Sequence, residues 1–205
     1  MYLTKLTLDP KNAQARRDLG NAYEMHRTLV RAFVPDANSE PPRFLWRLEA
    51  SRSSWDHPVV LVQSETEANW SALIQLTNYL QAPVESKHLA LDLFVQTERL
   101  YRFRLLANPT VTREGKRHGL VGDRDLTLWM ERQGERHGFV VQSCVVNGKD
   151  TLTTRNSGKA SLCIQRVRFE GVLQVHQPDV FKQTLIAGIG PAKAFGCGML
   201  SVAPC

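Results

Sequence analysis

The pattern of apolar and polar residues predicts strands and helices in the first half of the chain. Apolar and polar residues alternate along Tyr2–Leu8, which is typical of a strand. Apolar residues about three to four positions apart follow, most clearly over Asn21–Phe33, and predict an amphipathic helix. Further along this half we expect strands over Phe44–Leu48, Val59–Gln63 and Ser86–Val95 and a helix over Trp70–Leu80.

The second half of the chain predicts the same order of elements. A helix is expected over Asp123–Arg136, because apolar residues share one side of it and Gly138 follows as a stop signal. Pro178 suits the first turn of another helix, which is expected to reach Ala187. The expected strands are Leu100–Ala107, Phe139–Val146, Ser161–Val175 with a turn at Glu170–Gly171, and Leu200–Val202. Thr110–Gly122 is a polar, basic stretch.

The order β-α-β-β-α-β therefore occurs twice, and this order is that of a ferredoxin-like unit. We predict an α+β protein of two tandem ferredoxin-like (RRM-like) domains, over residues 1–90 and 91–205. The two halves share the order of elements but no visible residue repeat. The first domain would carry the helix over Asn21–Phe33, and the second would carry a basic face and a glycine-rich loop.

Charge narrows the expected partners. The 205 residues include 26 Lys and Arg against 20 Asp and Glu, which gives a net charge of +6 and a pI of about 9.4. This balance favours an anionic partner, nucleic acid before acidic lipid, although a merely basic soluble enzyme fits composition alone equally well. The cysteines form no C-x-x-C pair, and the N-terminus does not have the pattern of a signal peptide. No apolar run approaches the ~20 residues of a membrane span. A cytoplasmic protein is therefore expected.

The first place where chemistry could occur is the helix over Asn21–Phe33. His26 lies at the edge of its apolar stripe, and Tyr23 lies one turn away on the same side. An imidazole can transfer a proton near neutral pH, and a phenol can donate a hydrogen bond to developing charge. Arg27 and Arg31 are spaced to hold phosphates. From the helix alone, a boundary His and Tyr beside solvated arginines is the favoured interpretation.

The second is the glycine-rich segment Gly188–Gly198. Lys193 lies within it, together with Gly190, Gly196 and Gly198. Glycines allow backbone to approach a phosphate, and lysine adds charge. The segment follows a predicted helix and precedes a strand, so it fits neither a dinucleotide-binding fingerprint nor a Walker A loop. A tight chain reversal is the alternative interpretation.

The third is the basic sequence of the second half. Along Leu100–Ala107 we expect Tyr101 and Phe103 to face the core and Arg102 and Arg104 to share the other face. These arginines could contact RNA in a groove, or they could belong to a basic sheet face that is exposed only to solvent. Further cations follow at Lys116, Arg117, Lys149, Arg155, Lys159, Arg166 and Arg168, among others.

No metal-ligand motif and no nucleophile elbow is present, since the six histidines are scattered and no G-x-S-x-G sequence occurs. We therefore expect no metal site and no cofactor.

Together these features resemble one family, CasE, the type I-E CRISPR endoribonuclease that cuts repeat RNA into guide units. The segments that carry the resemblance are Met1–Lys5, Tyr23–His26, Phe103–Pro109, Val167–Leu173 and Gly188–Pro204. They occur in order along the whole chain, and the C-terminal segment is the most specific.

The resemblance implies that the first helix supplies the active-site histidine, here His26, and a nearby tyrosine, here Tyr23. It implies a catalytic lysine shortly before the Phe-Glu-Gly strand, and Lys159 is the nearest candidate. A serine also assists in some members, for which Ser157 is a weak nominee. The implied reaction is attack by the RNA 2′-OH on the neighbouring phosphate without a metal ion, and whether His26 is the base or the acid stays open.

The resemblance also implies that the protein stays on its product within the Cascade complex. The expected partners are thus the hairpin of CRISPR repeat RNA and other Cascade subunits, with no membrane. The alternatives are a non-catalytic RNA-hairpin-binding subunit and a metal-dependent nuclease. The residues nominated for RNA binding are Arg27, Arg31, Lys116, Arg117, Arg155, Lys193, Gly190, Gly196 and Gly198.

Overall fold

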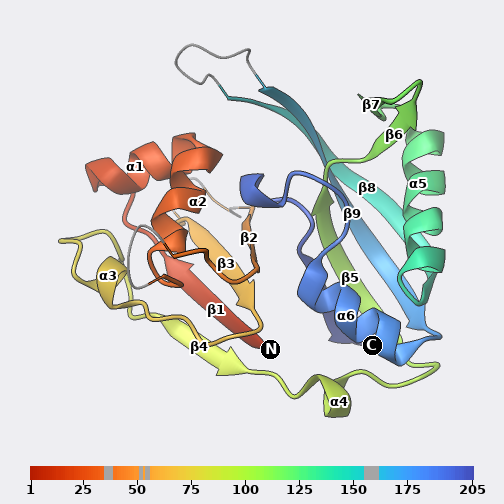
Figure 1. Cartoon of the computed structure of the whole chain (residues 1–205), viewed down its shortest axis with the longest axis horizontal. Coiled ribbons are helices and arrows are strands. Elements are labelled where there is room, and N and C mark those ends of the chain that lie inside the picture. Colours follow the sequence, from red (N-terminus) through yellow and green to blue (C-terminus); the bar gives the residue numbers. More distant parts are fainter. Residues whose placement is uncertain (35–38, 51–52, 54–55, 155–161) are drawn as a thin grey trace. The chain divides into compact units, whose positions relative to one another are not determined.

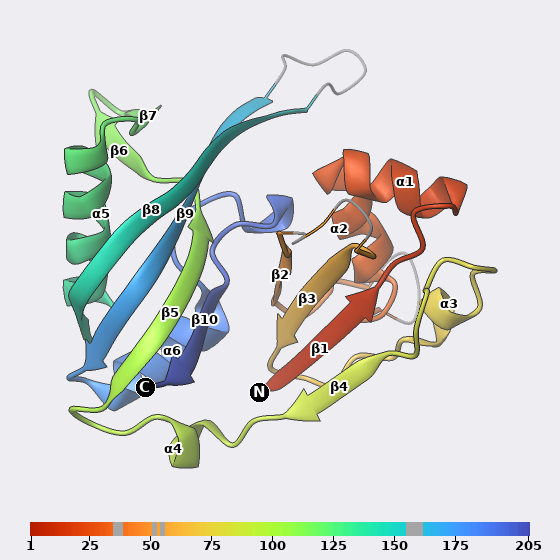
Figure 2. The same ribbon diagram turned by 180° about the vertical axis from the view of Figure 1, so that it is seen from behind.

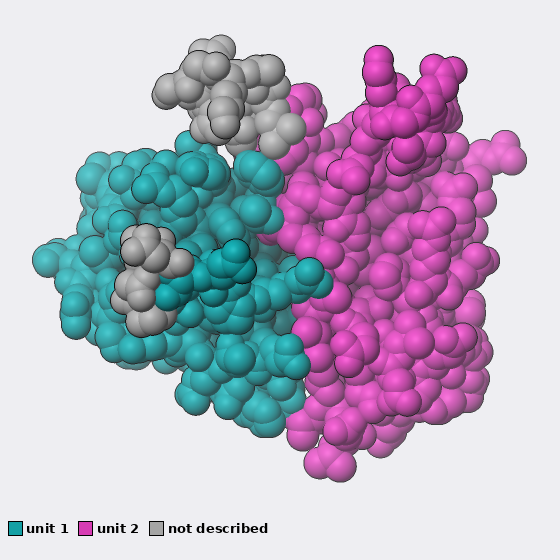
Figure 3. Space-filling model, in the orientation of Figure 1, with its two compact units in different colours: residues 1–89, 194–196 teal, residues 90–193, 197–205 magenta. Residues whose placement is uncertain are grey.

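The computed structural model describes residues 1–34, 39–50, 53, 56–154 and 162–205. These residues form two compact units, which Figure 3 colours separately. Unit 1 consists of Met1–Leu89 together with Ala194–Gly196, and unit 2 consists of Ala90–Lys193 together with Cys197–Cys205. No helix in the described part of the chain is both long and apolar enough to cross a lipid bilayer.

Unit 1 contains a four-stranded antiparallel sheet with spatial order β2-β3-β1-β4 (Figure 1). This is the strand order of a ferredoxin-like unit, because the first and third strands are central. The strands are β1 (Tyr2–Thr7), β2 (Phe44–Leu48), β3 (Val59–Ser64) and β4 (Glu85–His88). The helices are α1 (Ala13–Gly20), α2 (Ala22–Val30) and α3 (Ser71–Ile74).

The face of this sheet that packs on α2 forms the core of unit 1. Leu6 of β1 and Val60 and Val62 of β3 point to this face and are buried. From α2, Met25 and Leu29 are buried against them, and these residues are one turn apart on the helix. This packing turns the opposite side of α2 outward, where polar side chains can meet a ligand.

Unit 2 contains a second four-stranded antiparallel sheet, with order β10-β5-β9-β8. The same ferredoxin-like order thus recurs, and helices α5 and α6 cover one face of this sheet (Figure 1). The strands are β5 (Leu100–Ala107), β8 (Phe139–Thr154), β9 (Leu162–Val175) and β10 (Leu200–Pro204), with a separate hairpin of β6 (Thr110–Arg113) and β7 (Lys116–Gly119). The helices are α4 (Leu91–Phe94), α5 (Asp123–Arg136), α6 (Pro178–Ala187) and the short 3₁₀ helix η1 (Lys193–Phe195).

Strands β8 and β9 continue beyond the four-stranded part of the second sheet. β5 pairs with β9 only over Val167–Gln174, whereas β8 and β9 stay paired as far as Thr154 and Leu162. The extension is a two-stranded ribbon that projects from the sheet in both views (Figures 1 and 2). Gly171 permits the close crossing of β8, because a Cβ there would lie 2.0 Å from the Ser143 carbonyl oxygen.

The prediction of two ferredoxin-like units is confirmed, and several elements match the sequence pattern closely. The expected α5 and α6 have the predicted bounds, as do β2 and β5. Tyr101 and Phe103 are buried while Arg102 and Arg104 are exposed, as the alternation of β5 predicts.

Three local predictions are wrong, and one element was missed. The expected helix Trp70–Leu80 ends after one turn at Ile74, and the expected strand Ser86–Val95 ends at His88 and is followed by α4. β9 passes through Glu170–Gly171 without turning, since each residue of this pair keeps its partner on β5. The polar, basic stretch Thr110–Gly122, for which no element was predicted, contains the β6–β7 hairpin.

Candidate functional site

Helix α2 positions the principal candidate residues in unit 1. It begins after Asn21, whose side-chain oxygen accepts a hydrogen bond from the Tyr23 backbone N–H at 3.0 Å. This N-cap ends α1 at Gly20 and starts a new helix direction, so Tyr23 falls in the first turn of α2. The buried stripe of α2 then fixes which residues face outward.

His26 lies at the boundary between the core and the surface. Its ring stacks on Phe44 of β2, with 5.0 Å between ring centroids and an interplanar angle of 18°. The ring is half-buried, and Nδ1 is enclosed without a hydrogen-bond partner among the described residues. Burial lowers the pKa of His26 below its ordinary value of 6.5. The ring is therefore held neutral, and Nε2 is the nitrogen available to a substrate.

Tyr23 and Arg27 form the outer surface of α2. The Tyr23 side chain is 43% exposed, and the Arg27 guanidinium lies 5.9 Å from the centre of its ring. Glu24 accepts a hydrogen bond from Arg27 at 3.2 Å and lies 3.7 Å from Arg17. Arg27 is thus oriented by a carboxylate, and the phenol and guanidinium together offer hydrogen-bond donors to an anion.

Arg31 follows the last residue of α2 and continues the same side of the helix. It is exposed, and its guanidinium has no hydrogen-bond or ion-pair partner in the described part of the chain. Tyr23, Arg27 and Arg31 are spaced four residues apart, so they lie on one side of the helix. The structure places Tyr23, His26 and Arg27 within α2 and Arg31 directly after it, and the roles assigned to these residues stay predictions.

The glycine-rich segment has structural reasons for its glycines. Gly198 has φ +91°, and its N–H donates to the Leu106 carbonyl at 2.7 Å, which ties the segment to β5. Gly196 has φ +79°, and a Cβ there would lie 3.1 Å from the Trp46 ring of β2. Gly190 also has a positive φ, of 77°. The chain-reversal interpretation therefore explains these positions, and any contact with RNA is an additional role.

Lys193 lies in η1, where it is half-buried and already has a partner within the protein. It lies near His137, whose pKa is lowered by burial first and by Lys193 and Arg136 second. His137 Nδ1 is 2.9 Å from the Thr184 hydroxyl, so this histidine links the end of α5 to α6. Lys193 thus belongs to a cationic group in unit 2, whereas Gly196 belongs to unit 1.

Lys116 and Arg117 are exposed on the β6–β7 hairpin, where neither side chain has a partner among the described residues. Other cations of the second half are already paired. Arg104 donates to Glu170 at 2.6 Å, Arg166 donates to Asp150 at 2.6 Å, and Lys149 donates to Asp123. The expected continuous basic surface is therefore interrupted by internal ion pairs.

Lys159, Arg155 and Ser157 lie outside the described residues, so their predicted roles stay predictions. The residues that sequence reasoning missed are Phe44 and Trp46 of β2, which contact the His26 ring and the Gly196 backbone respectively. Their alternation on β2 could have indicated a shared buried face, but not what it packs against. Among the described residues, no three His, Cys, Asp or Glu side chains are grouped as a metal-ligand set.

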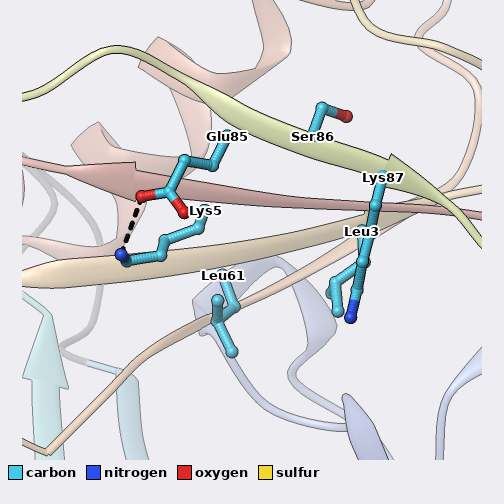
Figure 4. Close-up of a pocket in the computed structure, with 6 residues that line it drawn as sticks. All are labelled: Leu3, Lys5, Leu61, Glu85, Ser86 and Lys87. Atoms are coloured by element: carbon cyan, nitrogen blue, oxygen red, sulfur yellow. Dashed lines mark hydrogen bonds and ion pairs between the residues drawn. The ribbon is translucent and has the colours of Figure 1, made fainter.

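A pocket of about 370 Å³ lies on the face of the first sheet that points away from α2 (Figure 4). Its floor is formed by Leu3 and Leu61, and Lys5 and Glu85 form an ion pair at 2.8 Å on its side. Because Lys5 is paired with Glu85, Lys87 is the remaining cation of this pocket, beside an apolar floor. The chemistry on α2 is the better candidate.

Comparison with known proteins gives consistent results. The model of the CRISPR associated protein family matches residues 1–204. The CRISPR-associated endoribonuclease Cse3 of Thermus thermophilus is 41% identical, and the CRISPR system Cascade subunit CasE of Escherichia coli is 29% identical, each with full coverage of both chains. A structure of CRISPR endoribonuclease Cse3 bound to a 19-nucleotide RNA superimposes with a TM-score of 0.87 at 39% identity, with full coverage of both chains.

Proposed function

Because this chain belongs to the CasE family of type I-E CRISPR-associated proteins, we propose that it binds the hairpin of CRISPR repeat RNA and cuts the precursor into guide RNAs. The observation that best supports this proposal is the position of His26 on α2. The ring is half-buried with Nδ1 enclosed, and Tyr23 and Arg27 lie beside it on the exposed side of the helix. A proton-transfer group next to phosphate-binding groups is what cleavage of an RNA strand requires.

The proposed reaction uses the 2′-OH of the RNA itself. The 2′ oxygen loses its proton and attacks the adjacent phosphorus, and the bond from phosphorus to the 5′ oxygen breaks. The departing 5′ oxygen gains a proton, so the products are a 2′,3′-cyclic phosphate and a 5′-hydroxyl. The nucleophile is supplied by the substrate, and the protein must supply proton transfer, orientation and positive charge.

His26 is proposed as the proton-transfer residue. Since burial lowers its pKa, the ring is neutral at physiological pH. A neutral ring can begin the reaction by accepting the 2′ proton at Nε2, so this environment favours the general-base role. Tyr23 and Arg27 are proposed to donate hydrogen bonds to the phosphate oxygens as their negative charge increases. Lys159 is proposed, from the family resemblance, to add positive charge at the same phosphate.

Binding of the hairpin is proposed to depend on phosphate contacts from exposed cations. Lys116 and Arg117 of the β6–β7 hairpin are the best supported nominees in unit 2, because their side chains are exposed and have no partner among the described residues. The basic net charge of +6 would also increase the rate of encounter with RNA. By analogy with the E. coli Cascade subunit, the protein would remain on its product as part of a Cascade complex.

Cleavage of cognate repeat RNA in EDTA, with and without His26→Ala, tests this proposal. We expect the wild type to cut in EDTA and His26→Ala to lose cutting by at least about 10²-fold, the lower range for a general acid–base group. The variant should still bind the hairpin, and His57→Ala is the matched control because His57 is exposed in the same unit.

Two results would contradict the mechanism. Loss of cutting in EDTA would indicate a metal-dependent nuclease. Cutting of an RNA with a 2′-deoxy sugar at the scissile position would exclude 2′-OH attack. Binding without any cutting by the wild type would instead support a non-catalytic hairpin-binding subunit.

A further inference from the structure

A second pocket in unit 1 lies where α2 ends and the chain leads into α3. Its volume is about 460 Å³, which is within the usual range of ~300–1,000 Å³ for ligand pockets. Arg31 and Phe33 form one side, and the segment from Glu67 to Gln75 forms the other. All of these residues belong to the same compact unit as His26.

The walls of this pocket are fixed by hydrogen bonds and ring contacts. The Asn69 backbone N–H donates to the Ala32 carbonyl at 2.8 Å, which joins the end of α2 to the opposite wall. The Asn69 side-chain oxygen accepts from the Ser71 N–H at 3.0 Å, so its amide group has a fixed direction. Phe33 packs edge-on to Trp70, with 6.0 Å between ring centroids. The pocket is therefore formed before a ligand arrives.

The polar side chains of this pocket are available for binding. Arg31, Gln75 and Glu67 are exposed and have no hydrogen-bond or ion-pair partner in the described part of the chain. The Asn69 side-chain NH₂ likewise has no acceptor there, although its oxygen is used by Ser71. The pocket thus offers one cation, amide groups that donate and accept, and one carboxylate, beside the apolar surface of Phe33.

This combination matches a nucleotide better than a simple anion or an apolar ligand. A guanidinium binds a phosphate, and amide side chains bind the hydrogen-bonding edge of a base. A carboxylate would repel a bare phosphate, but it can accept a hydrogen bond from an amino group of a base. A flat base also needs apolar surface, which Phe33 provides.

The pocket is connected to the candidate catalytic histidine by a stack of rings. Phe33 stacks on Phe44 with 4.5 Å between centroids, and Phe44 in turn stacks on His26. Arg31 directly follows the last residue of α2, so the pocket lies just beyond the end of the helix that carries His26.

We infer that this pocket binds one unpaired nucleotide of the RNA strand that flanks the scissile phosphate, with Arg31 on its phosphate and Asn69 and Gln75 on its base edge. The inference rests on the proposed function and adds a subsite to it. Recognition of an unpaired base fits the way in which proteins read RNA sequence outside helical stems.

The test is a double-mutant cycle that combines abasic RNAs with a variant of the pocket and compares their binding affinities. Hairpin RNAs carry a single abasic site at successive unpaired positions on either side of the cut, and their Kd values are measured with wild type and with Asn69→Ala/Gln75→Ala. We expect one abasic position to weaken wild-type binding about five- to tenfold, from one or two lost hydrogen bonds. The same abasic site should not weaken binding further in the double variant. Gln81→Ala is the matched control, because Gln81 is an exposed amide of unit 1 outside the pocket.

The outcomes separate this inference from the proposed function. Suppose that the wild type binds the intact hairpin. If it then binds every abasic RNA equally well, or if the losses in binding free energy from the abasic site and from the double variant are additive, the subsite is overturned while the proposed function stands. If the wild type does not bind the hairpin, both are overturned. Unchanged thermal unfolding of the double variant shows that a loss of binding comes from the pocket and not from misfolding.

Discussion

At the scale of single residues, the surroundings of His26 determine how it can act. Its ring lies against Phe44, and Nδ1 is enclosed without a partner among the described residues. Adding a proton would place a positive charge in this apolar contact, beside an Nδ1 that has no partner among the described residues, so the neutral form is favoured. The low pKa thus follows from the same packing that positions the ring.

Phe44→Leu should raise the pKa of His26 toward 6.5, because the smaller side chain admits water beside the imidazole. The acid limb of the cleavage pH profile should then move to higher pH. A pH titration of the His26 ring by NMR measures the shift directly. Phe94→Leu, a matched change in unit 2, is the control, and an unchanged His26 titration in Phe44→Leu would contradict the assigned cause.

The same environment affects stability. Because the folded-state pKa of His26 lies below the unfolded value, the unfolded chain binds more protons as the pH falls below about 6.5. The free energy of unfolding therefore decreases as the pH falls below about 6.5, and this decrease levels off only below the pKa of His26 in the folded state.

Gly196→Ala should be more destabilising than Gly115→Ala. Both glycines have similar positive φ values, of 79° and 73°, so each alanine costs about 1–2 kcal/mol of backbone strain. Only at Gly196 does the new Cβ meet the Trp46 ring, at 3.1 Å, whereas the space at Gly115 is open. Overpacking should add about 1–3 kcal/mol, measurable by denaturant unfolding. Equal losses in the two variants would mean that the Trp46 contact gives way freely.

At the scale of elements, a buried hydrogen bond holds α1 against the turns that follow α3. The Tyr79 hydroxyl donates to the Asp18 carboxylate at 2.9 Å, and both side chains are buried. Burial first, and the Asp18 charge second, raise the pKa of Tyr79. Since the Asp18 carbonyl also accepts from the Asn21 N–H that precedes α2, this bond fixes the corner from which α2 begins.

Tyr79→Phe should therefore destabilise unit 1 by about 1–3 kcal/mol, the cost of leaving a buried carboxylate short of a donor. The measurement is denaturant unfolding, with Tyr2→Phe as the control because the Tyr2 hydroxyl has no hydrogen-bond partner in the described part of the chain. A loss no larger than that of Tyr2→Phe would show that Arg17, which also binds Asp18, suffices for the carboxylate.

The β6–β7 hairpin should contribute to RNA binding through charge. Lys116→Ala should reduce the slope of log affinity against log salt by about 0.7–0.9, as for one lost phosphate contact. Lys149→Ala is the matched control, because Lys149 already donates to Asp123 and the Val121 carbonyl. If Lys116→Ala and wild type gave equal slopes, Lys116 would not contact an RNA phosphate.

The elements that the sequence predicted well have strong local signals. α6 begins with Pro178 and α5 ends before Gly138, whose φ is 77°. The β6–β7 hairpin was missed because its turn is Glu114–Gly115, both with positive φ, and Glu is an uncommon residue at the first of these positions. β9 was predicted to turn at Gly171, but that glycine accommodates the neighbouring strand, which only the tertiary structure reveals.

At the scale of the whole molecule, the sequence predicted the helix that carries the candidate residues but not which cations are free to bind RNA. Helical periodicity places Tyr23, Arg27 and Arg31 on one side and His26 at the edge of the apolar stripe, and the family resemblance is what nominates His26 and Tyr23 for catalysis. Whether a lysine or arginine is free to meet RNA depends on partners distant in sequence, such as Glu170 for Arg104. The two pockets described above likewise depend on which strands and loops become neighbours.

Deleting Ala194–Cys205 should destabilise both units. The deletion removes the Gly196 contact with Trp46 from unit 1 and the edge strand β10 from unit 2. Hydrogen exchange should show lost protection in β2 as well as in β5. If protection fell in β5 alone, the Gly196 contact would contribute little to unit 1.

The return of Ala194–Gly196 to unit 1 has a consequence for synthesis on the ribosome. About a hundred residues are translated between the end of the first segment of unit 1 and the contact that covers Trp46. At ~5–20 residues per second, this delay is roughly 5–20 s. The edge of the Trp46 ring that Gly196 contacts thus stays uncovered throughout that time, so the last packing step of unit 1 waits for translation of the C-terminal segment.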